Sequence, residues 1–298
     1  MSTFSGDAMA LGCALVWAIA VMLFRRLHRI DPAAVNLFKN VLASGMLLVT
    51  MAVLGVRFDT TRSAGDFALL ALSGALGLAV ADTLFLAGLR RIDASIAAVT
   101  DCAYAPTVLL LSTLWLHEAI RGGLLIGGPL VVAGLFIVAW EPHSAGRSGR
   151  GTAPRIDRVG VLLAVGGVVT TAIGVVIAKP ILDRSLLVEV TTVRLIAGSA
   201  SLLIYQLLTG RTRAALALFR PQPVWRQLMP ASIMGTYISM LLWLGGMKYG
   251  TASRSALLNQ MGAVFVLIFS RVAGEPVPLR RWIGAGVAIT GVAFVLAR

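Results

Sequence analysis

The sequence has little charge, and acidic charge is especially scarce. Its 298 residues contain 26 Lys and Arg, 13 Asp and Glu, and 3 His, which gives 13% charged residues and a formal net charge of +13. Soluble domains carry roughly 25% charged residues. Too few polar side chains remain to cover a globule of this length, so the composition argues against a cytosolic enzyme.

Residues suited to catalysis or metal binding are also scarce. Cys13 and Cys102 both lie in apolar runs and no CxxC occurs, so neither a disulfide framework nor a zinc site is expected. His117-Glu118 begins an HExxH pattern, but Arg121 stands where the second His belongs. The patterns GxxxxGK[ST] and GxSxG are missing as well. We therefore expect no catalytic residues, no metal, no cofactor and no direct use of ATP.

Apolar residues are abundant, at 58% of the chain, and the mean hydropathy is +0.87. A membrane-spanning helix needs about 20 mostly apolar residues. Basic residues gather in short clusters between the apolar runs, as at lipid headgroups, and form no single stripe suited to nucleic acid. Ten candidate spans follow from this pattern: Ala8–Phe24, Ala34–Gly55, Phe67–Leu89, Ala94–Leu116, Gly122–Trp140, Val159–Ala178, Leu186–Leu208, Leu228–Met247, Thr251–Ser270 and Trp282–Ala297.

The fold class predicted from these runs is an all-α integral membrane protein, because a chain in lipid must pair its backbone polar groups internally. The stretch Glu141–Asp157, rich in Gly, Ser, Pro and Arg, is typical of a linker. The expected division is residues 1–140, a polar linker at 141–158, and residues 159–298. The first run has no basic residues before it, so we expect a retained membrane helix rather than a signal peptide. The expected location is the inner or plasma membrane.

The two halves resemble each other in four blocks. The offset between matching residues is about 155 to 158 throughout. Each half has an odd number of spans, so the second half must enter the membrane from the opposite side. Inverted repeats of this kind are typical of secondary transporters, whose substrate site lies near the midplane between the halves. The paired blocks are Phe38–Leu48 with Val193–Leu203, Leu86–Ser95 with Leu244–Ser253, Glu118 with Glu275, and Gly127–Trp140 with Gly284–Ala297.

With these features the sequence resembles the EamA-type members of the drug/metabolite transporter superfamily. The resemblance rests on the two five-span repeats, on a basic residue in the second span of each half (Lys39 and Arg194), and on the segments beginning at His117 and Gly274 that close the fourth span of each half. It covers almost the whole chain. It implies ten transmembrane helices in two inverted repeats and export or exchange of small metabolites by alternating access.

Three charged residues are expected inside the membrane near one face. Counted at 1.5 Å per residue, Lys39 and Asp101 lie about 8 to 10 Å from the start of their spans and Asp82 about 10 Å from the end of its span, and these ends lie at the same membrane face. Intramembrane charges normally face a cavity or a partner. Lys39 can form a salt bridge with one acid, which is a structural role. The other acid is then left without a base, which favours proton coupling or binding of a substrate ammonium group.

Arg194 has a different setting in the second half. The residues that correspond to the two acids are Met240 and Asn259, and both are uncharged. Glu189 is five residues away and is a poor helical partner. Arg194 is therefore a candidate to bind a substrate carboxylate or phosphate. The alternative is that helix-end carbonyls, or Asn259 and Gln260, satisfy the guanidinium.

Aromatic residues can line a cavity, although such residues also pack between helices or lie at the membrane interface. Trp17, Tyr104, Tyr237 and Trp243 are the candidates. The predicted site for substrate binding or coupling comprises Lys39, Asp82, Asp101, Arg194, Tyr104, Tyr237, Trp243, Asn259 and Gln260. Together these residues suggest an amino acid or a small organic anion as substrate, with proton coupling.

The orientation in the membrane stays open. Lys and Arg are about twice as frequent in the loops on the side away from the termini, which places both termini outside. The family resemblance implies the opposite, with both termini inside. We expect a small-molecule substrate, surrounding lipid, no nucleic acid, and a monomer or homodimer. Competing functions are a lipid flippase, a membrane partner that transports nothing, and a membrane-embedded enzyme.

Overall fold

The structure is a computed structural model that describes residues 3–24, 27, 30–89, 91–92, 99–120, 122–139, 157–274 and 276–297. Within these ranges the regular structure is helical and contains no strand. Eight helices are long and apolar enough to cross a membrane, and Gly123–Ala139 is a shorter apolar helix. An all-helical membrane protein is therefore confirmed. The expected linker falls almost entirely on residues 140–156, outside the described part of the chain.

The first half contains three of the eight long apolar helices and the shorter helix, and the second half contains the other five. The third span is one continuous rod made of α3, the π-helix η2 and α4. Of the expected fourth span, Ala94–Leu116, residues 94–98 lie outside the described part, so the count of ten stays a prediction. The helices are α1 (Thr3–Phe24), α2 (Pro32–Val53), α3 (Ala64–Gly74), η2 (Ala75–Val80), α4 (Ala81–Leu89), α6 (Tyr104–Trp115) and α7 (Gly123–Ala139).

The second half repeats this arrangement. Its third span is again a rod with a π-helix inside it, and its fourth is α13 followed by α14. The short α10 is additional to the predicted spans. The helices are α8 (Arg158–Arg184), α9 (Leu187–Leu208), α10 (Thr212–Ala217), α11 (Trp225–Ser232), η3 (Ile233–Ile238), α12 (Ser239–Tyr249), α13 (Ala252–Asn259), α14 (Gly262–Val272) and α15 (Leu279–Leu296).

Local sequence explains several helix ends. The Ser63 hydroxyl accepts the Asp66 N–H at 3.1 Å at the start of α3, and Asp157 caps α8 through the Val159 N–H at 2.9 Å. The expected end of the sixth span at Ala178 is wrong. Pro180 removes one backbone donor without ending α8, and the pair Lys179–Asp183, one turn apart at 2.6 Å, supports the final turn.

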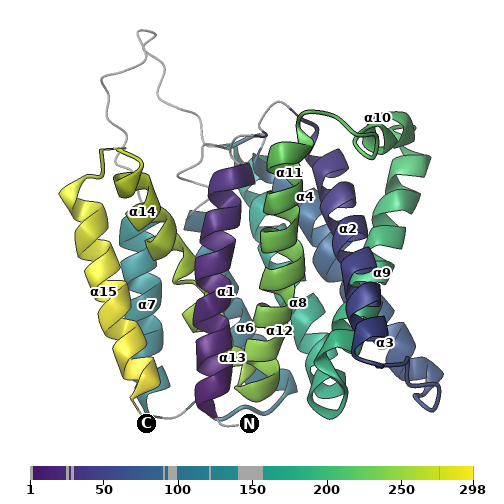
Figure 1. Cartoon of the computed structure of the whole chain (residues 1–298). Coiled ribbons are helices and arrows are strands. Elements are labelled where there is room, and N and C mark those ends of the chain that lie inside the picture. Colours follow the sequence, from purple (N-terminus) through teal and green to yellow (C-terminus); the bar gives the residue numbers. More distant parts are fainter. Residues whose placement is uncertain are drawn as a thin grey trace, which may run out of the picture.

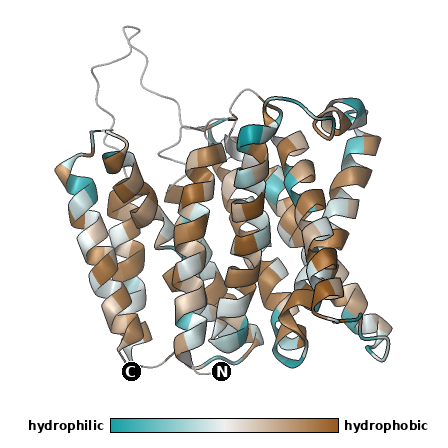
Figure 2. Cartoon of the chain, in the orientation of Figure 1, coloured by the Kyte–Doolittle hydropathy of each residue, from teal (hydrophilic) through white to brown (hydrophobic). Residues whose placement is uncertain are grey.

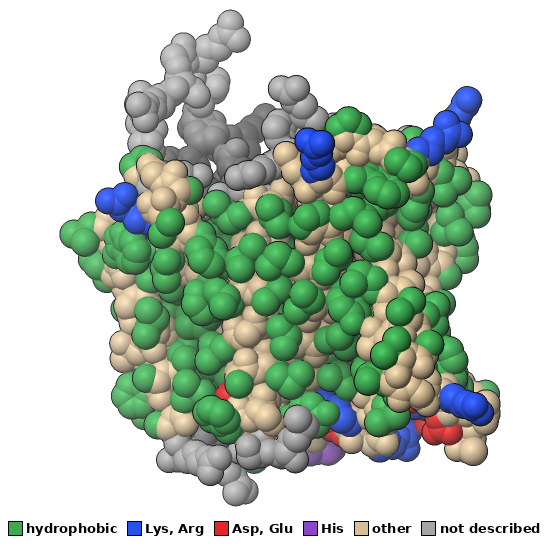
Figure 3. Space-filling model, viewed as in Figure 1, with side chains coloured by type: hydrophobic (Ala, Val, Ile, Leu, Met, Phe, Trp, Pro, Cys, Tyr) green, Lys and Arg blue, Asp and Glu red, His purple; other side chains and the backbone are tan. Residues whose placement is uncertain are grey.

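The two halves run through the bundle in opposite senses. α1 starts at the end where both chain termini lie, which we call the terminal face, and α8 starts at the opposite end, the linker face (Figure 1). Apolar helix surface fills the region between the two ends (Figure 2), and hydrophobic side chains cover the side seen in Figure 3, with charges at its edges. Both orientations weighed from the sequence place the termini on one side, as here.

The closest contact between the halves is the antiparallel pair α7 and α15, which makes the most extensive helix–helix contact in the chain. Gly127 lies against Gly291, and Gly134 lies against Gly284. In the repeat, Gly127 corresponds to Gly284 and Gly134 to Gly291. A two-fold rotation exchanges these two contacts, so the pairing has the symmetry of an inverted repeat. Glycine on both sides lets the two backbones approach closely.

Candidate functional site

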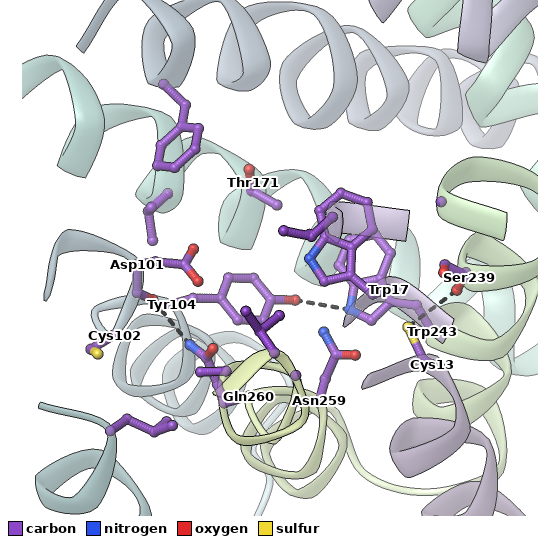
Figure 4. Close-up of a pocket in the computed structure, with 18 of the residues that line it drawn as sticks. Cys13, Trp17, Asp101, Cys102, Tyr104, Thr171, Ser239, Trp243, Asn259 and Gln260 are labelled. Carbon is purple, nitrogen blue, oxygen red and sulfur yellow. Dashed lines mark hydrogen bonds between the residues drawn. The ribbon is translucent and has the colours of Figure 1, made fainter. Parts of the chain in front are cut away.

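A cavity of about 720 Å³ lies between the halves. Side chains from both halves form its wall. It extends toward the linker face, where Ala139 ends α7 and Arg281 lies in the first turn of α15. Pockets of this size are typical of small-molecule sites. The polar and aromatic lining includes Trp17, Lys39, Asp82, Asp101, Tyr104, Thr171, Ser239, Trp243, Asn259 and Gln260. Figure 4 labels all of these residues except Lys39 and Asp82.

Lys39 on α2 and Asp82 at the start of α4 face each other in this wall. The Lys39 ammonium is 3.6 Å from the Asp82 carboxylate and 3.5 Å from the Asn40 side-chain oxygen. Asn40 in turn donates to Asn36 at 3.3 Å. The structure thus contains the expected salt bridge between Lys39 and one acid. Both charged side chains remain partly open, which keeps the pair in contact with the cavity.

Asp101 is the second acid of the cavity. It lies where the helical chain is interrupted at Cys102 and Ala103 before α6 begins, and its side chain is exposed within the cavity. Figure 4 shows the carboxylate beside the Tyr104 ring. Its backbone carbonyl accepts the Gln260 side-chain N–H at 3.0 Å, which joins the halves. Within the described ranges, no Lys or Arg forms an ion pair with this carboxylate.

Aromatic side chains form one wall. The Trp243 indole N–H donates to the Tyr104 hydroxyl at 3.1 Å, and the ring centroids are 6.4 Å apart (Figure 4). Tyr104 thus keeps its own O–H to donate. Trp17 lies nearby on α1, and the Cys13 thiol donates to the Ser239 carbonyl at 3.3 Å. This wall offers apolar surface with a few oriented polar groups.

Arg194 lies behind this cavity and is not part of its lining. It is 1% exposed, and its Nε donates to the Ser73 hydroxyl at 2.8 Å. Glu189 pairs with Arg62 at 2.8 Å, so it is not the partner of Arg194. Nη1 and Nη2 of Arg194 have no hydrogen-bond partner in the described part of the chain, so neither Asn259 and Gln260 nor a helix-end carbonyl binds these two atoms here. Among the residues that the structure describes, Arg194 has no carboxylate partner.

Tyr237 points elsewhere. Its hydroxyl is 2.7 Å from that of Thr50 on α2, and it lines a separate, mainly apolar hollow of about 650 Å³ with Phe38 and Trp225. Of the nine predicted site residues, Tyr237 and Arg194 lie outside the cavity lining. The structure brings the other seven to one cavity: Lys39, Asp82, Asp101, Tyr104, Trp243, Asn259 and Gln260. Residues six positions apart on a helix point about 120° away from each other, so helical spacing already favours different surroundings for Tyr237 and Trp243.

Two irregular features escaped the sequence analysis. The π-helices η2 and η3 occupy matching places in the third span of each half, and both contribute cavity residues, Gly77 and Gly235. The fourth spans are interrupted at matching places as well, beside Asp101 and beside Asn259. π-Helical turns occur frequently at functional sites. The repeat supplied the only available signal, since each pair of positions is separated by the same offset as the surrounding blocks.

The fold and the cavity define a multi-pass membrane protein that encloses a chamber of the size of a small solute. Comparison with protein families then identifies it: the model of the EamA-like transporter family matches residues 4–140 and again residues 158–297. The chain belongs to the EamA-like transporter family. It is therefore a membrane transporter of the drug/metabolite transporter superfamily, as the sequence resemblance indicated.

Solved structures share the fold. One, described only as the crystal structure of a protein, aligns with a TM-score of 0.77 over 98% of this chain and 96% of its own, at 18% sequence identity. At that identity the likeness shows the architecture alone. A search of curated proteins found no matching relative.

Proposed function

We propose that this chain is a secondary transporter that moves a small organic solute by alternating access between two inverted five-helix repeats, ten spans in all. The observation that carries the proposal is the cavity of about 720 Å³, which both halves line and in which the Asp101 carboxylate has no ion-pair partner among the described residues. In transporters built from inverted repeats, substrate and coupling ions bind near the midplane between the repeats. The sequence has no phosphate-binding loop, so a gradient supplies the energy.

Asp101 is the proposed cation site of the cavity. A carboxylate inside a membrane protein is expensive unless it is paired or protonated. Lys39 already has Asp82, so Asp101 is available for a proton or for the ammonium group of a solute. Tyr104, Trp17 and Trp243 supply apolar contact for the carbon part of that solute. The favoured substrate is therefore a small organic molecule with an amino group, exchanged for protons.

Contacts between the halves close the cavity at the terminal face. Glu118, after α6, accepts the N–H groups of Ala252 and Ser253 at 2.8 and 3.1 Å and the Ser253 hydroxyl at 2.7 Å. Arg254 on α13 binds Asp7 on α1 at 2.6 Å. None of these residues lines the cavity, which extends the other way. The structure thus fits the state of the cycle that is shut at the terminal face.

Uptake into proteoliposomes tests the proposal. A panel of amines, amino acids and organic acids is supplied with and without a pH gradient, to wild type, Asp101→Asn and Asp66→Asn. Asp66 pairs with exposed Arg184 outside the cavity, so Asp66→Asn controls for loss of a carboxylate. We expect Asp101→Asn to abolish gradient-driven transport and Asp66→Asn to retain it. Equal transport by all three proteins would refute the role of Asp101.

The competing flippase function predicts a different result. The apolar hollow beside Tyr237, lined by α2 and α11 residues, has the character of an acyl-chain site. If labelled lipid crosses the bilayer faster in the presence of the protein while no soluble solute does, the flippase is favoured over the solute transporter.

A further inference from the structure

Arg194 presents an unusual arrangement for an intramembrane charge. It is the largest of the fully buried side chains, at 1% exposed. Its Nε donates to the Ser73 hydroxyl, and that hydroxyl donates to the Gly174 carbonyl. Nη1 and Nη2 have no hydrogen-bond partner in the described part of the chain. Removing a guanidinium from water without a counterion costs several kcal/mol. An anion would accept the N–H groups of Nη1 and Nη2, and the described residues supply none there.

The free edge of the guanidinium lies next to the cavity wall. A Cβ on Gly77, which lines the cavity, would stand 3.6 Å from Arg194 Nη2. The guanidinium carbon is 5.8 Å from the centre of the Trp243 ring, which also lines the cavity. Nη2 therefore lies beside Gly77, which has no side chain, and the guanidinium lies beside the Trp243 ring, and both of these residues line the cavity.

The repeat explains how Arg194 reaches solute. Lys39, its counterpart in the first half, lines the cavity that extends to the linker face, and finds Asp82 there. If the halves exchange conformations when the terminal face opens, Arg194 takes the exposed position that Lys39 has now. The residues corresponding to Asp82 and Asp101 are Met240 and Asn259, so neither of these two positions offers it a carboxylate.

We propose that Arg194 is the anion-binding group of the pathway, and that it binds a carboxylate or phosphate group of the solute through Nη1 and Nη2 when the cavity opens at the terminal face. The planar fork of Arg suits two parallel hydrogen bonds to either group. This inference rests on the proposed transport function. Together with Asp101, Arg194 gives the pathway one site for a cationic group and one for an anionic group.

Three solutes of one carbon skeleton separate the two sites: leucine, 3-methylbutylamine, which lacks the carboxylate, and 4-methylpentanoate, which lacks the amine. Binding of each, and of inorganic phosphate, is measured by calorimetry on the full chain in nanodiscs, where both faces are accessible. The variants are Arg194→Gln, Arg194→Lys and Gly77→Ala, with Arg213→Gln on exposed α10 as the control. Gly77→Ala keeps Arg194 and places a methyl group beside Nη2 at ordinary contact distance. It therefore tests the same site even if the Arg194 variants fail to fold.

We expect Arg194→Gln to weaken 4-methylpentanoate or phosphate binding by about 10- to 100-fold, the value of a charge-assisted hydrogen bond. The amine-to-anion affinity ratio should rise in Gly77→Ala and stay constant in Arg213→Gln, with Arg194→Lys intermediate. Unchanged anion affinity in Arg194→Gln and Gly77→Ala, or no anion binding to wild type, overturns the inference. A failure of the proposed function gives a different result. In that case amine transport does not depend on Asp101, while the affinity ratios of the Arg194 and Gly77 variants still change as expected.

Discussion

The glycine pairing of α7 with α15 predicts that one methyl group destabilises the protein at Gly284 but not two residues later. A Cβ at Gly284 would lie 2.7 Å from the Gly134 carbonyl oxygen, 2.8 Å from the Val138 nitrogen and 2.9 Å from an Ile137 methyl group. Two of these three atoms are backbone, so the contact is relieved only by separating the helices. A Cβ at Gly286 would meet nothing within 4 Å.

The magnitude follows from these contacts. Overpacking a tight interface costs about 1–3 kcal/mol, which sets the expected loss for Gly284→Ala. Replacing an unstrained helical Gly by Ala gains up to about 1 kcal/mol, which sets the expectation for Gly286→Ala. The two variants add the same methyl group to the same helix, so their difference isolates the contact between α7 and α15.

Unfolding free energies in mixed micelles, followed by helical circular dichroism during titration with sodium dodecyl sulfate, provide the assay. We expect a difference of about 1–4 kcal/mol between the variants, Gly286→Ala being the more stable. Equal stability of the two variants would refute the close antiparallel pairing of α7 with α15. By the symmetry of the pairing, Gly127→Ala should resemble Gly284→Ala.

Two further changes test the contacts around the cavity. Glu118→Ala removes the carboxylate that accepts the Ala252 and Ser253 N–H groups at the start of α13, beside the N-cap residue Thr251. A helix-capping interaction is worth about 0.5–2 kcal/mol, so the terminal face should open about 2- to 30-fold more often. Labelling of a cysteine placed at buried Ser255, in a background with Cys13 and Cys102 replaced by Ala, measures this opening, and an unchanged rate would mean that Glu118 does not hold the face shut. Glu189→Ala leaves the Arg62 side chain, which is 4% exposed, without its carboxylate partner. The free energy of unfolding in the same titration should fall by about 3–5 kcal/mol, because a buried charge then has no partner. A loss below about 1 kcal/mol would show that water reaches the pair.

The sequence alone determined the fold class and the repeat. Long apolar runs predict spanning helices because lipid offers no partner to a backbone N–H or C=O, and this rule needs no knowledge of neighbours. The matched blocks and the odd span count predicted opposite senses for the two halves, and the Gly127 and Gly284 contacts agree. The intramembrane acids could be predicted as cavity residues because a charge in lipid needs water or a partner.

Tertiary structure decided which predicted residues share the cavity and in what role. Lys39 pairs with Asp82 and not with Asp101, and the π-helix η2 lies just before Asp82 in the rod, an irregularity that regular helical spacing does not reveal. Arg194 lies behind Gly77, and Tyr237 turns toward Thr50. Hydropathy is a property of each segment, but the facing of a side chain depends on how helices distant in sequence pack together, so only the folded chain fixes it.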